Sequence, residues 1–132
     1  MRRWLGVVLM LAGCVPDGIA RATCESEMLA TGDPEHCKVY ADFVTQKSAI
    51  HFDSESRNFV AQVQISLRVA KGTLDVVYRD LEGPHRVTIT PQAPFATSME
   101  TKLHRETRSF TLDFEPQGRV EGLSGTVDFA TR

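Results

Sequence analysis

Three cysteines, and a histidine beside one of them, are the residues with the most specific chemistry in this chain. Cys24 and Cys37 form an even pair once Cys14 is set aside, and such a pair in an oxidising compartment is typical of a disulfide. Closing a loop of that length is worth roughly 3 kcal/mol by the loop-entropy argument. In the metal alternative, Cys24, His36 and Cys37 are three ligands. Adjacent ligands are awkward and no fourth has the usual spacing, so we expect the disulfide, no metal and no cofactor.

The other histidines, the serines and the carboxylates follow no catalytic pattern that the sequence reveals. His51, His85 and His104 are expected to be solvated, on polar faces or in turns. Ser124 lacks the G-x-S-x-G frame of a nucleophile elbow, and we expect it in a turn. Four acidic residues are expected at outward strand positions: Asp75, Asp113, Glu115 and Asp128. The sequence therefore predicts a protein that is not an enzyme.

The N-terminus has the order of an export signal. Met1-Arg2-Arg3 is positively charged, and the apolar run over residues 4–11 is too short to span a bilayer, which favours a cleaved signal peptide. Leu11-Ala12-Gly13-Cys14 is typical of a bacterial lipobox, and cleavage there would leave lipidated Cys14 as the mature N-terminus. Ala20-Arg21-Ala22 is the rival site, with the A-x-A form of ordinary signal peptidase. We favour the lipoprotein, with residues 1–13 as signal peptide and 1–22 as the alternative.

Residues 14–46 are predicted to be an anchor, a tether and a short helical segment that the disulfide closes. Residues 25–30 are expected to form one or two helical turns. Asp33, Pro34 and Glu35 make a good helix start, and residues 37, 40, 41 and 44 follow at helical spacing. The same stretch also alternates at Val39, Ala41 and Phe43, which would suit a strand. We favour the helix, with Tyr40 and Phe43 packed on the domain.

Residues 47–132 are predicted to be a β-sandwich domain. Apolar residues alternate over 59–69 and again over 73–78, which predicts a long central hairpin. Further strands are expected at 48–52, 86–90, 95–103, 110–114 and 123–129, with a bend at Pro91 and Pro94 and a loop over 116–122. Seven short antiparallel strands, each with one apolar face, predict a mainly β fold, an immunoglobulin-like sandwich.

The predicted core consists of the inward apolar positions of these strands. They are Val63, Ile65, Leu67, Leu74, Val76, Tyr78, Val87, Ile89, Met99, Leu103, Phe110, Leu112, Phe114, Val127 and Phe129. Each large apolar side chain contributes about 1.5–3 kcal/mol when buried, so this set is adequate for one domain.

Several short stretches in the second half of the chain carry a family resemblance. They are Lys71-Gly72-Thr73-Leu74-Asp75-Val76, Pro94-Phe95, Phe110-Thr111-Leu112 and Gly122-Leu123-Ser124-Gly125-Thr126-Val127. This pattern of strands and turns, after a lipobox, resembles small uncharacterised bacterial envelope lipoproteins with a β-sandwich body. The resemblance implies an envelope protein with a sandwich body, and it transfers no functional residues. From the lipobox we expect this protein to be lipid-anchored to the bacterial envelope, on the periplasmic side of the outer membrane.

We therefore expect a non-enzymatic binding or structural accessory module. Its partner would be an envelope protein or a cell-wall component, and the lipid anchor would be its only contact with the membrane. The formal net charge of −2, with no run of Lys or Arg, argues against nucleic acid. Val60 and Val77 break the outward polar pattern and are candidate contact points.

A Thr-rich set is a further candidate surface: Thr88, Thr90, Thr97, Thr101, Thr107 and Thr111. The alternative function is a soluble periplasmic or secreted inhibitor of an envelope-attacking hydrolase. Its contact loop would be residues 80–85 or 104–108. A small enzyme is the third alternative, ranked after these two.

Overall fold

The computed structural model of the chain describes residues 18–26, 35–54 and 59–131, and within them it contains strands and turns without a helix. The strands are β1 (Arg21–Ser26), β2 (Glu35–Val44), β3 (Ser48–Asp53), β4 (Val60–Arg68), β5 (Lys71–Asp80), β6 (Gly83–Ile89), β7 (Phe95–Lys102) and β8 (Ser109–Thr131). The mainly β, antiparallel prediction is confirmed, and the count of seven strands is wrong because the described ranges alone contain eight. Nothing in these ranges is a helix long and apolar enough to cross a membrane. Cys14 and residues 4–11 lie outside the described residues.

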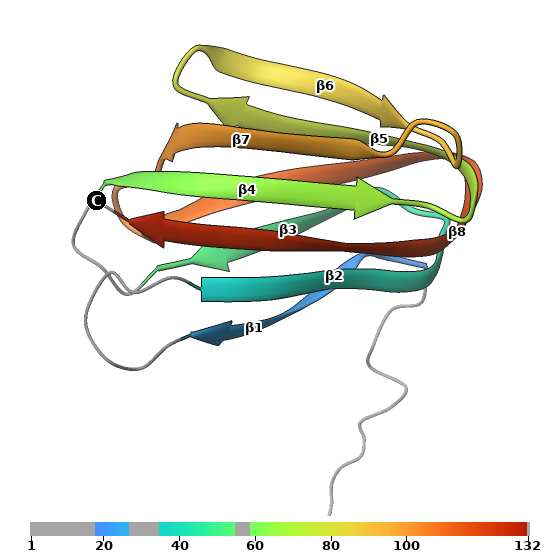
Figure 1. The fold of residues 1–132 in the computed structure, drawn as a ribbon, viewed down its shortest axis with the longest axis horizontal. Helices are drawn as coiled ribbons and strands as arrows, with labels where there is room; N and C mark the ends of the chain where they lie inside the picture. Colours follow the sequence, from blue (N-terminus) through green and yellow to red (C-terminus); the bar gives the residue numbers. More distant parts are fainter. Residues whose placement is uncertain (1–17, 27–34, 55–58, 132) are drawn as a thin grey trace, which may run out of the picture.

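The long strand β8 organises the sheet. Its first half pairs with β3 and β5, and its second half pairs with β2 and β4, always antiparallel. The outer strands then add to these neighbours: β1 to β2, β7 to β4, and β6 to β5. Figure 1 shows the red, C-terminal part of β8 running between β2 and β4. Two strand groups, β1-β2-β8-β4-β7 and β3-β8-β5-β6, thus share one strand.

The stretch over residues 116–122, predicted as a loop, belongs to β8, so this prediction is wrong. Gly118 and Gly122 have φ angles of 79° and 68°, which only glycine adopts without steric cost. The strand can therefore change direction without ending. This bend lets one strand serve both groups.

The central hairpin is also wrong, although the alternation that suggested it is confirmed. Along β4 the odd positions from Ala61 to Leu67 are buried and the even positions from Gln62 to Arg68 are exposed. β4 pairs with β7 and β8, however, and β5 pairs with β6 and β8. The chain crosses from one group to the other at Ala70, whose N–H donates to the carbonyl of Glu121 (2.9 Å). β4 and β5 therefore lie in different groups although they follow each other in the chain.

The helix favoured in the N-terminal segment is wrong, because residues 35–44 form strand β2. Cys37, Val39 and Ala41 are buried in the alternating pattern that competed with the helical one. β2 has a partner on each side, β1 and β8, and those two ladders satisfy its backbone groups. Tyr40 does not pack on the domain but is 47% exposed. Of the helical turns expected at 25–30, residues 25 and 26 lie in β1 and the rest lie outside the described residues.

The predicted core is largely confirmed. Buried members are Val63, Ile65, Leu67, Leu74, Val76, Ile89, Leu103, Phe110, Leu112, Phe114, Val127 and Phe129. Tyr78, Val87 and Met99 pack against them and are partly buried. Phe129 from the second half of β8 makes edge contacts with Phe110 from the first half and with Phe52 of β3. The two strand groups therefore enclose one apolar core.

The core also contains residues that were not predicted: Val39, Val44, Ala61 and Val120, among others. Val44 and Val120 are cross-strand partners of β2 and β8, in the segments predicted as helix and loop. The bend at Pro91 and Pro94 is where the chain passes from β6 to β7, and an isolated bridge between Thr90 and Ala93 closes it. This segment joins the outer strands of the two groups.

Candidate binding groove

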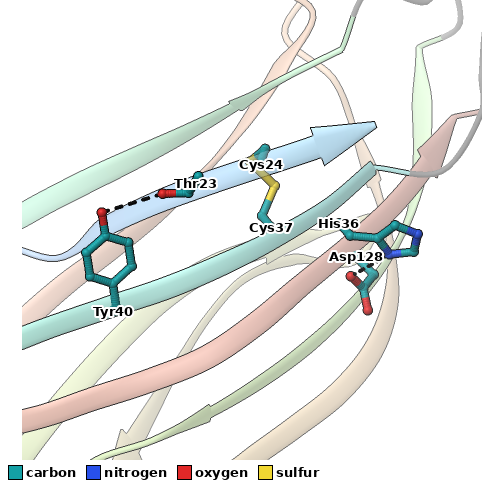
Figure 2. The surroundings of a disulfide bond; sticks show 6 residues. All are labelled: Thr23, Cys24, His36, Cys37, Tyr40 and Asp128. Atoms are coloured by element: carbon teal, nitrogen blue, oxygen red, sulfur yellow. Dashed lines mark hydrogen bonds and ion pairs between the residues drawn. A yellow bond between two sulfur atoms is a disulfide. The ribbon is translucent and has the colours of Figure 1, made fainter. Parts of the chain in front are cut away.

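The disulfide predicted between Cys24 and Cys37 is confirmed. The two cysteines are directly opposite in the β1–β2 ladder, so strand pairing brings them together (Figure 2). Cys37 is buried and Cys24 is exposed. Both sulfur atoms are used, and His36 lies outside this bond with its Nδ1 3.0 Å from Asp128 Oδ1. Among the described residues no three His, Cys, Asp or Glu side chains cluster as metal ligands.

Two of the outward carboxylates, Asp75 and Glu115, meet because they are opposite one another in the β5–β8 ladder. Arg86 of β6 lies between them, with Nη1 3.2 Å from Asp75 Oδ2 and 3.0 Å from Glu115 Oε1. Asp75 also accepts hydrogen bonds from Thr88 Oγ1 (2.7 Å) and Gln117 Nε2 (3.1 Å). This cluster holds β6 and β8 against β5 through side chains.

The hydrogen bond from Thr88 is the main reason that the pKa of Asp75 is lowered; Gln117 and Arg86 lower it further and desolvation opposes them. Contact with Glu115 and Asp75 raises the pKa of Arg86. Asp75 is therefore ionised at neutral pH, with its oxygens occupied as acceptors. Such a carboxylate is a poor proton donor and a good structural cross-link.

A groove of about 580 Å³ lies next to this cluster. Its lining comes from β5, the start of β6, the end of β7, the loop after β7 and the start of β8. Val77 is the apolar residue that breaks the outward pattern of β5, and it lines the groove opposite Asp113 in the ladder. The volume is in the range of small-molecule sites.

The base and the rim of the groove differ in character. The base contains Val77, Tyr78, Leu103 and Phe110, of which Leu103 and Phe110 are almost fully buried. The rim carries three exposed cations, Arg79, Lys102 and Arg105, and one half-buried acid, Asp113. The arrangement is an apolar depression with a cationic edge.

Hydrogen bonds fix the side of the groove where β5 and β7 meet. Thr101 Oγ1 donates to the carbonyl of Arg79 (2.7 Å), and Leu81 N–H donates to the carbonyl of Glu100 (3.1 Å). Thr101 is 2% exposed, so this member of the Thr-rich set is a buried link and not part of a solvated face. Because Lys102 follows Thr101, the backbones that carry Arg79 and Lys102 are held side by side.

The loop over residues 104–108 is held by its own bonds. His104 N–H donates to Ser109 O and Arg108 N–H donates to His104 O, both at 2.8 Å. His104 Nδ1 accepts the backbone N–H groups of Glu106 (3.3 Å) and Thr107 (3.5 Å). Arg108 has a φ of 56° and lies over the ring of Phe59. The loop therefore forms a defined wall of the groove.

The prediction that His85 is a solvated residue is wrong. It lies in β6, half-buried, with its ring stacked on Tyr78 (centroids 5.2 Å apart) and Nε2 2.9 Å from Asp80 Oδ2. The contact with His85 is the main reason that the pKa of Asp80 is lowered. Burial, and then the charge of Asp80, raise the pKa of Tyr78. Tyr78 thus remains a neutral phenol at the base of the groove.

The other predicted residues lie apart from this groove or at its border. His51 and Thr111 pair across β3 and β8 (2.8 Å), and Thr111 also lines the groove. Ser124 lies within β8, not in a turn, and accepts a hydrogen bond from Arg68 (3.2 Å). The groove itself was not predicted. The two signals that pointed toward it were apolar Val77 and the loop 104–108.

No protein-family model matches this chain, and no curated protein matches it.

Proposed function

We propose that this chain is a non-enzymatic, lipid-anchored envelope protein that acts as a binding or structural accessory module. The groove between β5, β7 and the loop 104–108 is the observation that carries this proposal. It is concave, partly apolar and bordered by charged groups, as ligand sites commonly are. We further propose that the body functions as a two-layer, immunoglobulin-like sandwich that presents this groove.

Binding is favoured over catalysis by the state of the paired carboxylates. Asp75 and Glu115 share Arg86, and the lowered pKa of Asp75 keeps it ionised. A pair arranged for acid–base chemistry has one member whose pKa is raised so that it can donate a proton. The cluster instead cross-links three strands beside the groove, which supports a structural role.

The anchor rests on Cys14 and its lipobox, which lie outside the described residues. The Cys24–Cys37 disulfide is consistent with export, because such bonds persist in oxidising compartments. The intact mass of the mature chain from membrane and soluble fractions tests the anchor. We expect a chain that starts at acylated Cys14 in the membrane fraction. A soluble chain starting at Thr23 would contradict it.

Site-specific photo-crosslinking in cells tests the binding role. A photoreactive phenylalanine derivative replaces Arg105 on the groove rim, or Lys47 in the turn between β2 and β3 as the matched exposed control. We expect Arg105, and not Lys47, to yield one identified envelope protein or wall fragment. Equal yields at the two positions would refute a binding role for the groove.

A second candidate is the inhibitor of an envelope-attacking hydrolase. The observation in its favour is the loop 104–108, which internal hydrogen bonds hold in one shape at the surface. Preorganised loops lose little entropy on binding. A titration of lysozyme with the purified chain tests it. Falling lysozyme activity at stoichiometric protein would support inhibition, and unchanged activity in large excess would exclude lysozyme as the target.

A further inference from the structure

We infer that the groove takes an organic anion: a carboxylate or phosphate ester carried on an apolar body. This inference rests on the proposed function, since it names the ligand class of the same groove. It depends on the combination of a cationic rim and an apolar base in one depression.

The rim has an excess of positive charge in a protein whose formal net charge is −2. Arg79, Lys102 and Arg105 come from β5, β7 and the following loop, and all three line the groove. None of them has an ion-pair partner among the described residues, whereas Arg86, the cross-strand partner of Val77, binds two carboxylates. Asp113 is the single carboxylate in the lining. Charge complementarity therefore favours an anion.

The placement of two of these cations is set by the backbone. The bond from Thr101 Oγ1 to the carbonyl of Arg79 holds the ends of β5 and β7 together. Arg79 and Lys102 therefore start from neighbouring points on the groove wall. Two cations held close together cost Coulomb repulsion, which a bound anion relieves.

The loop supplies a further hydrogen-bond donor beside the cations. Because His104 Nδ1 accepts two backbone N–H groups, its proton in the neutral ring lies on Nε2. That N–H is a hydrogen-bond donor on the side of the ring away from the loop backbone. Donors and cations, rather than acceptors, thus dominate this edge, as an oxyanion requires.

The base of the groove adds an apolar requirement. Val77 and Tyr78 are partly exposed and offer carbon surface below the rim, above the buried side chains of Leu103 and Phe110. Inorganic phosphate alone would leave that surface in water. A ligand with an apolar body would cover it and gain the free energy of burial.

Binding of small probes to the purified full chain, followed by NMR or calorimetry, tests the inference. Phenyl phosphate and benzoate carry both features, inorganic phosphate carries the charge alone, and phenol carries the ring alone. We expect one of the first two to bind at least about tenfold more tightly than the last two, and more weakly at high salt. Which of the two binds better identifies phosphate or carboxylate as the preferred anion.

Three variants locate the site. Arg79→Gln/Lys102→Gln/Arg105→Gln removes the rim charges, all at exposed positions, and should weaken binding of the anionic probe about tenfold. Lys38→Gln/Lys47→Gln/Lys71→Gln removes three exposed cations outside the groove and should change it less than about twofold. Val77→Thr keeps the shape of the base but adds a hydroxyl, and should weaken phenyl phosphate more than inorganic phosphate.

Three results would overturn the inference: phenyl phosphate and benzoate binding no better than phenol, equal losses in the two triple variants, or no effect of Val77→Thr. These results are distinct from failure of the proposed function. If groove-specific crosslinking to an envelope partner persists while the probes do not bind, the ligand class is wrong and the binding role stands. If the probes bind and groove-specific crosslinking fails, the ligand class stands and the role of the groove in binding an envelope partner is wrong.

Discussion

Phe129 is the residue whose truncation tests the two-group architecture most directly. It is 3% exposed and lies near the C-terminal end of β8. Its ring makes edge contacts with Phe110 (centroids 5.1 Å apart) and Phe52 (6.2 Å). Phe110 belongs to the half of β8 that pairs with β3 and β5, and Phe129 to the half that pairs with β2 and β4. The contact therefore joins the two strand groups.

Phe129→Ala should lower the free energy of unfolding by about 4 kcal/mol, because a buried Phe leaves both lost transfer energy and a cavity. That is a large share of the roughly 5–15 kcal/mol expected for a domain. Phe59→Ala is the matched control, since Phe59 is 47% exposed and its ring contacts Arg108. Losing that exposed contact should cost about 1 kcal/mol or less.

Urea unfolding followed by circular dichroism measures both variants with the disulfide intact. With a slope of roughly 1.5 kcal/mol per molar urea, Phe129→Ala should lower the midpoint by about 2.5 M and Phe59→Ala by less than about 0.7 M. A double-mutant cycle of Phe110→Leu and Phe129→Leu should show a coupling of about 0.5–1.5 kcal/mol.

The reasoning is refuted if Phe129→Ala costs no more than Phe59→Ala. Such a result would mean that β8 does not carry Phe110 and Phe129 into one core. If Phe129→Ala is strongly destabilising but the coupling in the cycle is near zero, the ring of Phe129 is buried, but not against Phe110.

Three further changes test other parts of the structure. Cys24→Ser/Cys37→Ser should lower the free energy of unfolding by roughly 3 kcal/mol, because the unfolded chain without the disulfide has a larger entropy. A loss below about 1 kcal/mol in urea titrations would mean that β1 is not held by this bond. Gly125→Ala should destabilise strongly in thermal unfolding, because a Cβ there would overlap the backbone of β4, and an unchanged melting temperature would contradict the close approach of β8 to β4. Asp75→Asn should lower the free energy of unfolding by about 1 kcal/mol at pH 7. Because the pKa of Asp75 is lowered by folding, its carboxylate stabilises the fold above the ordinary carboxyl pKa, and this contribution is lost as the pH falls through the pKa of the folded state. The difference between variant and wild type in urea titrations should therefore shrink as the pH is lowered below the ordinary carboxyl pKa, and a difference that stays constant from pH 7 into this acid range would show that the ionised carboxylate of Asp75 is not the stabilising form.

Which side chains of a strand are buried could be predicted from sequence because the alternation is local. Val63, Ile65 and Leu67 are buried, and the polar residues between them are exposed, as their spacing indicated. The Cys24–Cys37 disulfide could be predicted as well, since two thiols remain once Cys14 is assigned to the anchor. The burial pattern follows from a few neighbouring residues, and the disulfide follows from the number of cysteines.

Which strands pair with one another could not be predicted, because pairing depends on residues far apart in the chain. β4 and β5 follow each other and alternate in phase, yet each finds its partners elsewhere, since β8 lies beside both. Residues 37–44 suit a helix and a strand almost equally, and the edges of β1 and β8 decide for the strand. Gly118 and Gly122 signal a loop locally, but the hydrogen bonds that neighbouring strands offer keep them within β8.

The candidate groove could not be predicted from the sequence for the same reason. Arg79, Lys102 and Arg105 come from three segments with no shared spacing, and the meeting of β5 and β7 collects them. By itself, the sequence determined the mainly β class, the faces of the strands and the disulfide, because these follow from local alternation and cysteine number. Only the tertiary structure decided the strand partners, the bend of β8 and the groove, because these are contacts between distant segments whose energies no local pattern contains.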